Sequence, residues 1–222
     1  MVYGVYSHCA ANTKLKNGYD FYDWIVRKNC FPEFWGRTIS GDSKISKEEI
    51  NYLNQKGCKI FFIDNSLTEE SISGISGVQD ALKAIDKIKS LEISTNKRVA
   101  VFAEINSNWS INHNWMISYA GVLFDNGFTP GFIGNTDSSK NFNFDRQASH
   151  FFQATGKFNH FNALIMATEP KPEKEPEEWK PYCPSEISQK DIALWEISET
   201  NFDDFTAHNV YLQDKKTFDV FN

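Results

Sequence analysis

The sequence predicts an α/β fold, a (β/α)8 barrel of the TIM type whose late helices are short or degenerate. Short β-rich runs alternate with helical patterns along the 222 residues, which is typical of βα units and a parallel sheet. Eight such runs can be counted, the number that closes a barrel. Hydrophobic residues make up 41% of the chain, enough to fill a core. An open doubly wound sheet is the alternative.

The β-rich runs give the order of the predicted strands. Residues 60–63 are all apolar, as expected for a strand buried on both faces. Residues 2–6 also look β-like but do not fit the count, so we expect residues 1–16 to form an N-terminal extension packed on the barrel. The eight predicted strands are residues 18–22, 34–39, 58–64, 98–104, 131–135, 162–168, 192–197 and 217–221.

Helical patterns lie between most of these strands, at residues 23–28, 46–57, 77–91, 112–126 and 144–154. Ser46 and Glu49 form a capping box, and Gly57 stands where a C-terminal cap belongs. Residues 169–190 are rich in Pro, Glu and Lys and predict a long exposed loop. Since the chain has no internal repeat and no linker, we expect one domain over 1–222.

Charge and hydropathy exclude several partners. A net charge of −6 argues against nucleic acid and against anionic membrane surfaces. The chain has no stretch of about 20 apolar residues that would span a membrane, and its start lacks the pattern of a signal peptide. We therefore expect a soluble protein; the sequence leaves compartment and oligomeric state open.

Acidic residues recur where the predicted strands end. Such ends converge on the active-site face of a barrel, and like charges gathered there would keep one carboxylic acid protonated beside an ionised partner. Glycoside hydrolysis requires that combination. The residues at these positions are Asp20, Arg37, Asp64, Glu104, Asn135, Glu169, Glu196 and Asp219.

Each of these residues also has a structural interpretation. Strand-end carboxylates cap helices or pair with lysines, and Asp64 could initiate a turn. Arg37 could bind a sugar hydroxyl or form a salt bridge to Asp20 or Asp64. Trp195 could stack on a sugar or belong to the core. Asp20 and Glu104 are the strongest candidates, because large apolar residues flank both.

Other chemistries have less support. The five histidines show no metal-ligand spacing, and none stands at a predicted strand end, which argues against a zinc hydrolase and a phosphodiester-cleaving barrel. The chain has no G-x-S-x-G elbow and no Walker loop. We expect neither a metal nor a cofactor.

Several motifs resemble one family in order. They are G-Y-D (18–20), W-G-R-T-I (35–39), S-K-E-E-I-N-Y-L-N-Q-K-G-C-K-I (46–60), G-V-Q-D-A-L-K-A (77–84), V-F-A-E-I-N (101–106) and G-F-T-P-G-F-I-G-N (127–135), followed more loosely by L-W-E-I-S (194–198) and F-D-V-F-N (218–222). The sequence resembles bacterial glycoside-hydrolase-like barrel domains, distant relatives of the Chalaropsis-type (family 25) lysozymes, which cut peptidoglycan.

The resemblance implies a carbohydrate pocket at the strand ends, with Asp20 and Glu104 matching the family's acidic positions. The lysozymes carry an Asp-x-Glu pair at the end of strand four, whereas this chain has a single acid, Glu104, between Ala103 and Asn106. The first hypothesis is a hydrolase acting on peptidoglycan or a related β-linked glycan. Glu104 would be the general acid and Asp20 its partner; Arg37, Asp64, Asn135, Trp195, Glu196 and Asp219 would bind substrate. The second is a barrel that binds glycan or protein without cleavage.

Overall fold

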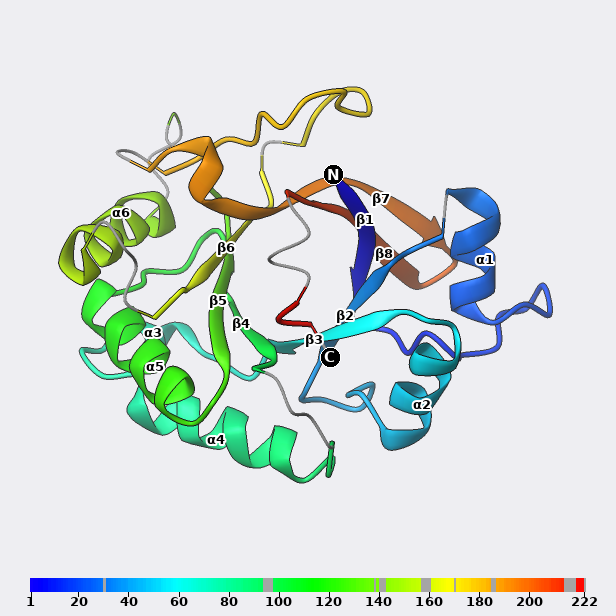
Figure 1. The fold of residues 1–222 in the computed structure, drawn as a ribbon, viewed down its shortest axis with the longest axis horizontal. Coiled ribbons are helices and arrows are strands. Elements are labelled where there is room, and N and C mark those ends of the chain that lie inside the picture. The colour runs from blue at the N-terminus through cyan, green and yellow to red at the C-terminus, as the bar shows by residue number, and fades with distance from the viewer. Residues whose placement is uncertain are drawn as a thin grey trace.

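The computed structural model of the chain describes residues 1–29, 31–93, 98–137, 139, 143–156, 161–169, 171–184, 187–213 and 219–221. Eight strands form one closed barrel in sequence order, which confirms the predicted fold class (Figure 1). The strands are β1 (Val2–Ser7), β2 (Phe34–Thr38), β3 (Lys59–Asp64), β4 (Ala100–Glu104), β5 (Thr129–Gly134), β6 (Leu164–Ala167), β7 (Ile192–Phe202) and β8 (Phe205–Leu212).

Helices cover the outside of the first part of the barrel (Figure 1). They are α1 (Phe21–Lys28), α2 (Lys47–Gln55), α3 (Glu69–Ser73), α4 (Val78–Lys89), α5 (His113–Asp125) and α6 (Asn143–Thr155), with a short 3₁₀ helix, η2 (Gln189–Asp191), before β7. No helix among the described residues is long and apolar enough to cross a membrane.

The last strand breaks the βα repeat. Strands β1 to β7 are parallel neighbours, but β8 runs antiparallel to both β7 and β1. A tight turn at Asp203 and Asp204 joins β7 to β8, and Asp203 adopts the left-handed conformation with φ 49°. Residues 192–213 are all described and contain no α-helix. The helix that packs on this hairpin is α1, through contacts of Phe21 with Phe205 and of Trp24 with Phe202.

The expected N-terminal extension is instead the first barrel strand. Val2–Ser7 pairs with β2 on one side and β8 on the other. Residues 18–22, predicted as the first strand, form a turn at Gly18 (φ 86°) and the beginning of α1, with Asp20 at its N-cap. Phe21 and Tyr22, the last residues of the segment that looked β-like, have helical spacing to Ile25 and belong to the buried face of α1.

The predicted strand at 217–221 is also wrong. Residues 214–218 lie outside the described part of the chain, and Asp219 and Val220 form a turn. The final strand is β8, whose inward positions include a histidine as well as Val210 and Leu212. Because polar and apolar residues mix on the inner side of β8, its sequence lacks the apolar run that marks the other strands.

Large aromatic side chains fill the barrel interior. Phe34, Phe61 and Phe102 are fully buried there and pack on one another. A glycine on the neighbouring strand makes room for such a ring: a Cβ on Gly4 would lie 2.3 Å from the ring of Phe34. Phe221 closes this cluster at the end where the strands begin, with its ring 5.2 Å from that of Phe34. We call this end of the barrel the base.

Candidate active site

The opposite end of the barrel, where β1 to β7 finish, is the mouth. Side chains on a strand alternate between the barrel interior and the helix-covered outside. Phe102 in β4 and Leu194 in β7 point inward, so Glu104 and Glu196, two positions further on, also point into the interior near the mouth. The alternation divides the candidate residues into an inward-facing and an outward-facing group. Arg37, Asp64 and Trp195 belong to the outward-facing group, because each stands one position away from an inward-facing residue.

Glu104 is the partly exposed acid at the mouth. It ends β4, and a quarter of its side chain is accessible. His8, the residue after β1, lies across the mouth with its Nε2 2.9 Å from Oε1 of Glu104. The hydrogen bond to Glu104 raises the pKa of His8 above 6.5, against the opposing effect of burial. The pair therefore holds a proton between an imidazole and a carboxylate, at a position that solvent reaches.

Glu196 is the buried acid of the mouth, with 2% of its side chain exposed. Three donors surround it: the Tyr6 hydroxyl at 2.7 Å, His208 Nδ1 at 2.9 Å and Lys171 Nζ at 2.8 Å. Burial alone would raise the pKa of Glu196, but the bonds to His208, Lys171 and Tyr6 outweigh it and lower the pKa. Glu196 is thus an ionised acceptor that holds its neighbours in place.

Tyr6 connects the two acids. Its ring stacks on that of His208, with centroids 4.2 Å apart and planes 7° from parallel. Burial, then the charges of Glu196 and Glu104, raise the pKa of Tyr6 well above 10. The hydroxyl therefore stays protonated and donates to Glu196, while the Tyr6 and His208 rings stack face to face inside the mouth.

Lys171 supplies a cation to this cluster from the loop after β6. Its Nζ lies 2.8 Å from Glu196 and 2.5 Å from Glu199. Glu196, Glu199 and His208 offer ligand atoms within 4.8 Å of one another, a spacing that suits a metal ion. In this structure the Lys171 ammonium contacts both carboxylates of that group, so the protein neutralises them with its own side chain.

Arg37 lies on the outside of the barrel wall and is fully buried. Its guanidinium donates to Glu49 of α2 at 2.6 Å, to the Ser7 carbonyl at 2.7 Å and to the Ser43 carbonyl at 2.6 Å. The side chain of Glu49 is therefore engaged by Arg37, while Ser46 accepts from the Glu49 amide as the capping pattern predicts. The structural interpretation of Arg37 holds, but with Glu49 as its partner, not Asp20 or Asp64.

Asp64 and Trp195 also face outward. Asp64 accepts from Tyr119 of α5 at 3.2 Å and from the Ser66 hydroxyl at 2.6 Å. Trp195 is 4% exposed and packs edge-on against Trp179 of the 169–190 loop, with centroids 6.0 Å apart. Both residues fasten outer elements to the barrel and leave the mouth to other side chains.

Asp20 and Asp219 lie away from Glu104. Asp20 pairs with Lys14 at 2.9 Å and accepts from Tyr52 of α2 at 3.2 Å, in the outer helical layer. Asp219 is exposed in the turn before Phe221, at the base. Lys14 and Tyr52 thus engage Asp20, whereas His8 engages Glu104, and Asp219 is at the wrong end of the barrel for the mouth.

The remaining candidates stand at the ends of β5 and β6. Asn135 is 4% exposed, and its side-chain oxygen accepts from the amide of Asp137 at 2.9 Å. It shapes the turn after β5 on the inward-facing side of the wall. Glu169 accepts from the amide of Lys171 at 3.2 Å and so helps to position that lysine.

Sequence reasoning missed five residues of the mouth: Tyr6, His8, Lys171, Glu199 and His208. The expectation that no histidine stands at a strand end is wrong, because His8 follows β1 and His208 lies in β8 near the mouth. The signal was the alternation of residues 2–6, which marks a barrel strand and would have placed His8 directly after it.

No protein-family model and no curated protein matches the chain. An uncharacterized protein from B. stearothermophilus superimposes with a TM-score of 0.78 at 20% identity over 100% of both chains. The Tat-secreted protein Rv2525c of Mycobacterium tuberculosis, solved in complex with HEPES, gives 0.58 at 13% identity over 96% of each chain. A family GH25 lysozyme from Aspergillus fumigatus gives 0.52 at 8% identity over 97% of this chain and 96% of the lysozyme. The chain therefore shares its barrel fold with these structures, a family GH25 lysozyme among them.

Proposed function

We propose that the protein hydrolyses glycosidic bonds of peptidoglycan or a related β-linked glycan, with Glu104 as the acid. The observation that carries the proposal is the position of Glu104 at the end of β4, facing the mouth, partly exposed and hydrogen-bonded to His8. Active sites of such barrels lie at this end. The shared fold with a lysozyme supports the choice of substrate, and a cell-wall substrate implies that the protein acts outside the cytoplasmic membrane.

The contacts of the mouth carboxylates indicate which chemistry fits. Glu199 is exposed but is bound by Lys171, whereas Glu104 is bound to His8, a residue that can exchange a proton with it. Glu196 is shielded by Tyr6, His208 and Lys171, so it is not free to attack a sugar. A substrate-assisted route needs no second free carboxylate. The oxygen of the sugar's own 2-acetamido group attacks the anomeric carbon while Glu104 gives its proton to the leaving oxygen. Water then opens the cyclic intermediate and returns a proton to Glu104.

His8 and the Tyr6–His208 surface have roles in this scheme. His8 shares a proton with Glu104, so it can reload the acid between the two steps. His208, which is partly exposed and stacked on the buried Tyr6 ring, would support the sugar ring in the orientation that its acetamido group needs. These roles restrict the proposed substrate to glycans with 2-acetamido sugars.

Clearing of purified bacterial cell walls tests the proposal. We expect the wild-type protein to lower turbidity and release reducing ends, and Glu104→Gln to reduce the rate at least 100-fold, as loss of a general acid does. Asp20→Asn is the matched control, since Asp20 lies in the outer layer, and it should keep the rate within about twofold. Activity that survives Glu104→Gln but is lost in Asp20→Asn would reverse the assignment.

Glycan binding without cleavage is the second candidate. The observation that favours it is the engagement of Asp20 by Lys14 and Tyr52 in the outer layer, which leaves Glu104 without the expected partner acid. Saturable binding of cell-wall fragments with no reducing ends after prolonged incubation would select this function over hydrolysis.

A further inference from the structure

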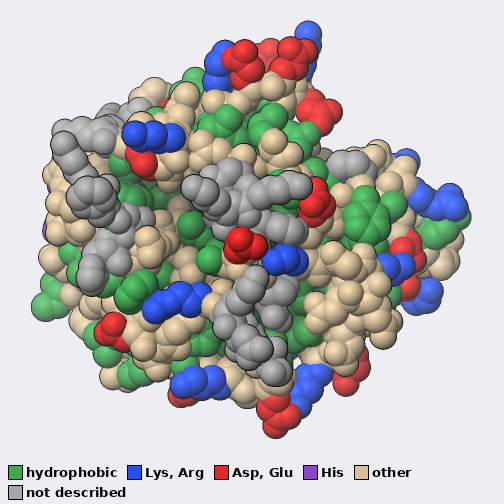
Figure 2. All heavy atoms as spheres, viewed as in Figure 1, with side chains coloured by type: hydrophobic (Ala, Val, Ile, Leu, Met, Phe, Trp, Pro, Cys, Tyr) green, Lys and Arg blue, Asp and Glu red, His purple; other side chains and the backbone are tan. Residues whose placement is uncertain are grey.

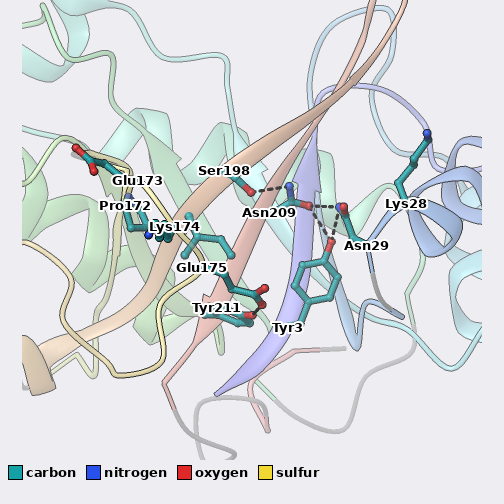
Figure 3. Close-up of a pocket in the computed structure, with 11 residues that line it drawn as sticks. Tyr3, Lys28, Asn29, Pro172, Glu173, Lys174, Glu175, Ser198, Asn209 and Tyr211 are labelled. Carbon is teal, nitrogen blue, oxygen red and sulfur yellow. Dashed lines mark hydrogen bonds between the residues drawn. The ribbon is translucent and has the colours of Figure 1, made fainter.

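A pocket lies on the outer face of β1, β7 and β8, between the end of α1 and the loop after β6 (Figure 3). Its volume is about 440 Å³, within the range of small-molecule sites. The side chains of Tyr3, Asn209 and Tyr211 come from the strands, and the loop segment 172–175 forms the opposite wall. Lys28 and Asn29, at the end of α1, complete it. This pocket is distinct from the mouth, because Tyr3, Asn209 and Tyr211 point away from the barrel interior.

A hydrogen-bond network fixes the floor of this outer pocket. Asn209 accepts from the Tyr3 hydroxyl at 2.7 Å and from Asn29 at 2.9 Å, and it donates to Ser198 at 3.0 Å (Figure 3). Asn29 also donates to Thr200 at 2.9 Å. The amide groups are therefore held in one orientation before any ligand arrives, which lowers the entropic cost of binding.

The chemistry of the lining favours a neutral, hydroxyl-rich ligand. Two lysines, Lys28 and Lys174, and two glutamates, Glu173 and Glu175, border the pocket, so their formal charges cancel. Charges of both signs also lie side by side on the loop at the top of Figure 2. The rings of Tyr3 and Tyr211 meet edge-on at 6.2 Å, which supplies flat apolar surface between the polar groups. Fixed amides, hydroxyls and aromatic rings together suit a sugar.

The loop that closes the pocket also reaches the mouth. Glu175 hydrogen-bonds to the Tyr211 hydroxyl at the pocket, and Lys171, four residues earlier, binds Glu196 and Glu199. One short segment thus joins the outer pocket to the mouth, and a ligand that contacts Glu175 would act on the part of the chain that carries Lys171.

We propose that the outer pocket is a second saccharide-binding site, which holds a further part of the same glycan chain outside the mouth. The identity of the ligand rests on the proposed function; the site itself rests on the pocket and its network. When the outer pocket holds one part of a glycan chain, the rest of the same chain stays close to the mouth. Its effective concentration at the mouth is therefore higher than that of a free glycan, as for any pair of linked binding sites.

Titration with tri-N-acetylchitotriose, followed by NMR in the full chain carrying Glu104→Gln, tests the site without cleavage. We expect saturable shifts of the side-chain amide signals of Asn29 and Asn209. Asn209→Leu should weaken this binding about tenfold, because it removes the acceptor that holds the Tyr3 hydroxyl and the Asn29 amide in place. Glu175→Ala should weaken it too, whereas Glu177→Ala, exposed on the same loop but outside the pocket, should not.

The outcomes separate this site from the proposed function. Amide shifts in a wild-type protein that releases no reducing ends would support the pocket and reject hydrolysis. Cleavage with no shift at Asn29 and Asn209 would reject the pocket alone. If Asn209→Leu does not fold, the comparison of Glu175→Ala with Glu177→Ala decides, and equal affinity in those two variants would overturn the proposal.

Discussion

His8 Nε2 and Glu104 Oε1 lie 2.9 Å apart, joining the end of β1 to the end of β4 across the barrel mouth. The two strands are not neighbours in the sheet, so this contact is made by side chains alone. It ties the exposed acid to a residue whose charge changes near neutral pH, and it makes the mouth sensitive to pH.

We expect the pKa of His8 to fall toward 6.5 when Glu104 is replaced by Gln, because the hydrogen bond to the carboxylate raises it in the wild type. Because the folded pKa of His8 is raised, the His8–Glu104 pair stabilises the fold fully below pH 6.5. This stabilisation disappears as the pH rises through the raised pKa. NMR titration of the imidazole measures both pKa values. Glu177→Gln, far from His8 in sequence and in the outer loop, serves as control, and an unchanged His8 pKa in Glu104→Gln would contradict the pairing.

Replacement of Glu196 by Gln should destabilise the protein by about 1–3 kcal/mol at pH 7, because Lys171 and His208 would lose their charged acceptor. The folded pKa of Glu196 lies below 4.5. Its contribution is therefore present above pH 4.5 and is lost as the pH falls through the folded value. Urea unfolding at pH 7 and at pH 3 measures the difference between wild type and variant.

Glu199→Gln is the matched control for that series. Glu199 shares Lys171 with Glu196 but is 37% exposed, so solvent screens its interaction and we expect a smaller loss. Equal losses in the two variants would show that the burial of Glu196 is unimportant.

The sequence predicted the closed barrel because β3, β4 and β6 carry apolar runs typical of buried strands, with helical patterns between them. Residues 2–6 looked β-like but exceeded the count of eight, because residues 18–22 had taken the first place. The inner face of β8 is partly polar, and its contacts explain why no apolar run marked it. Tyr6 and His208 are inward-facing polar or amphipathic residues that satisfy each other and Glu196, and no sequence pattern reveals a polar group whose partner is nearly the whole chain away. The acidic candidates were chosen because they stand at strand ends, without asking which side chains point into the barrel. Asp64, which points outward, and Glu104, which points inward, therefore looked equivalent.

Arg37→Ala should cost about 3–5 kcal/mol of stability, because it leaves Glu49 buried with no charged partner. The loss belongs to the packing of α2 on β2, so binding of glycan fragments to the folded fraction should stay within about twofold. Thermal unfolding and a binding titration on the same sample check both expectations. Replacing the pair together, as Arg37→Met with Glu49→Leu, should restore part of the stability; retained stability with lost binding in Arg37→Ala would instead make Arg37 a sugar ligand.

Phe221→Ala should destabilise the barrel by about 3–5 kcal/mol through the cavity that it opens. Its ring packs 5.1 Å from Phe61 and 5.2 Å from Phe34 at the base. Val220→Ala, a neighbouring position that is only partly buried, is the control and should cost less than half as much. Chemical denaturation measures both losses of stability. Equal denaturation midpoints for Phe221→Ala and Val220→Ala would mean that the Phe221 ring does not stabilise the base more than the partly buried Val220 does.

The pairing of β1 with β8 has a consequence for the time course of folding. Tyr3 and Asn209, hydrogen-bonded across this seam, are 206 positions apart in the chain. Most other strand pairs join neighbours along the chain and can form early, but this one must wait until the whole ring is in place, and contacts of such long range slow folding. The ring should therefore close last, and an opened barrel with an unpaired β1 edge is the intermediate that refolding experiments should detect.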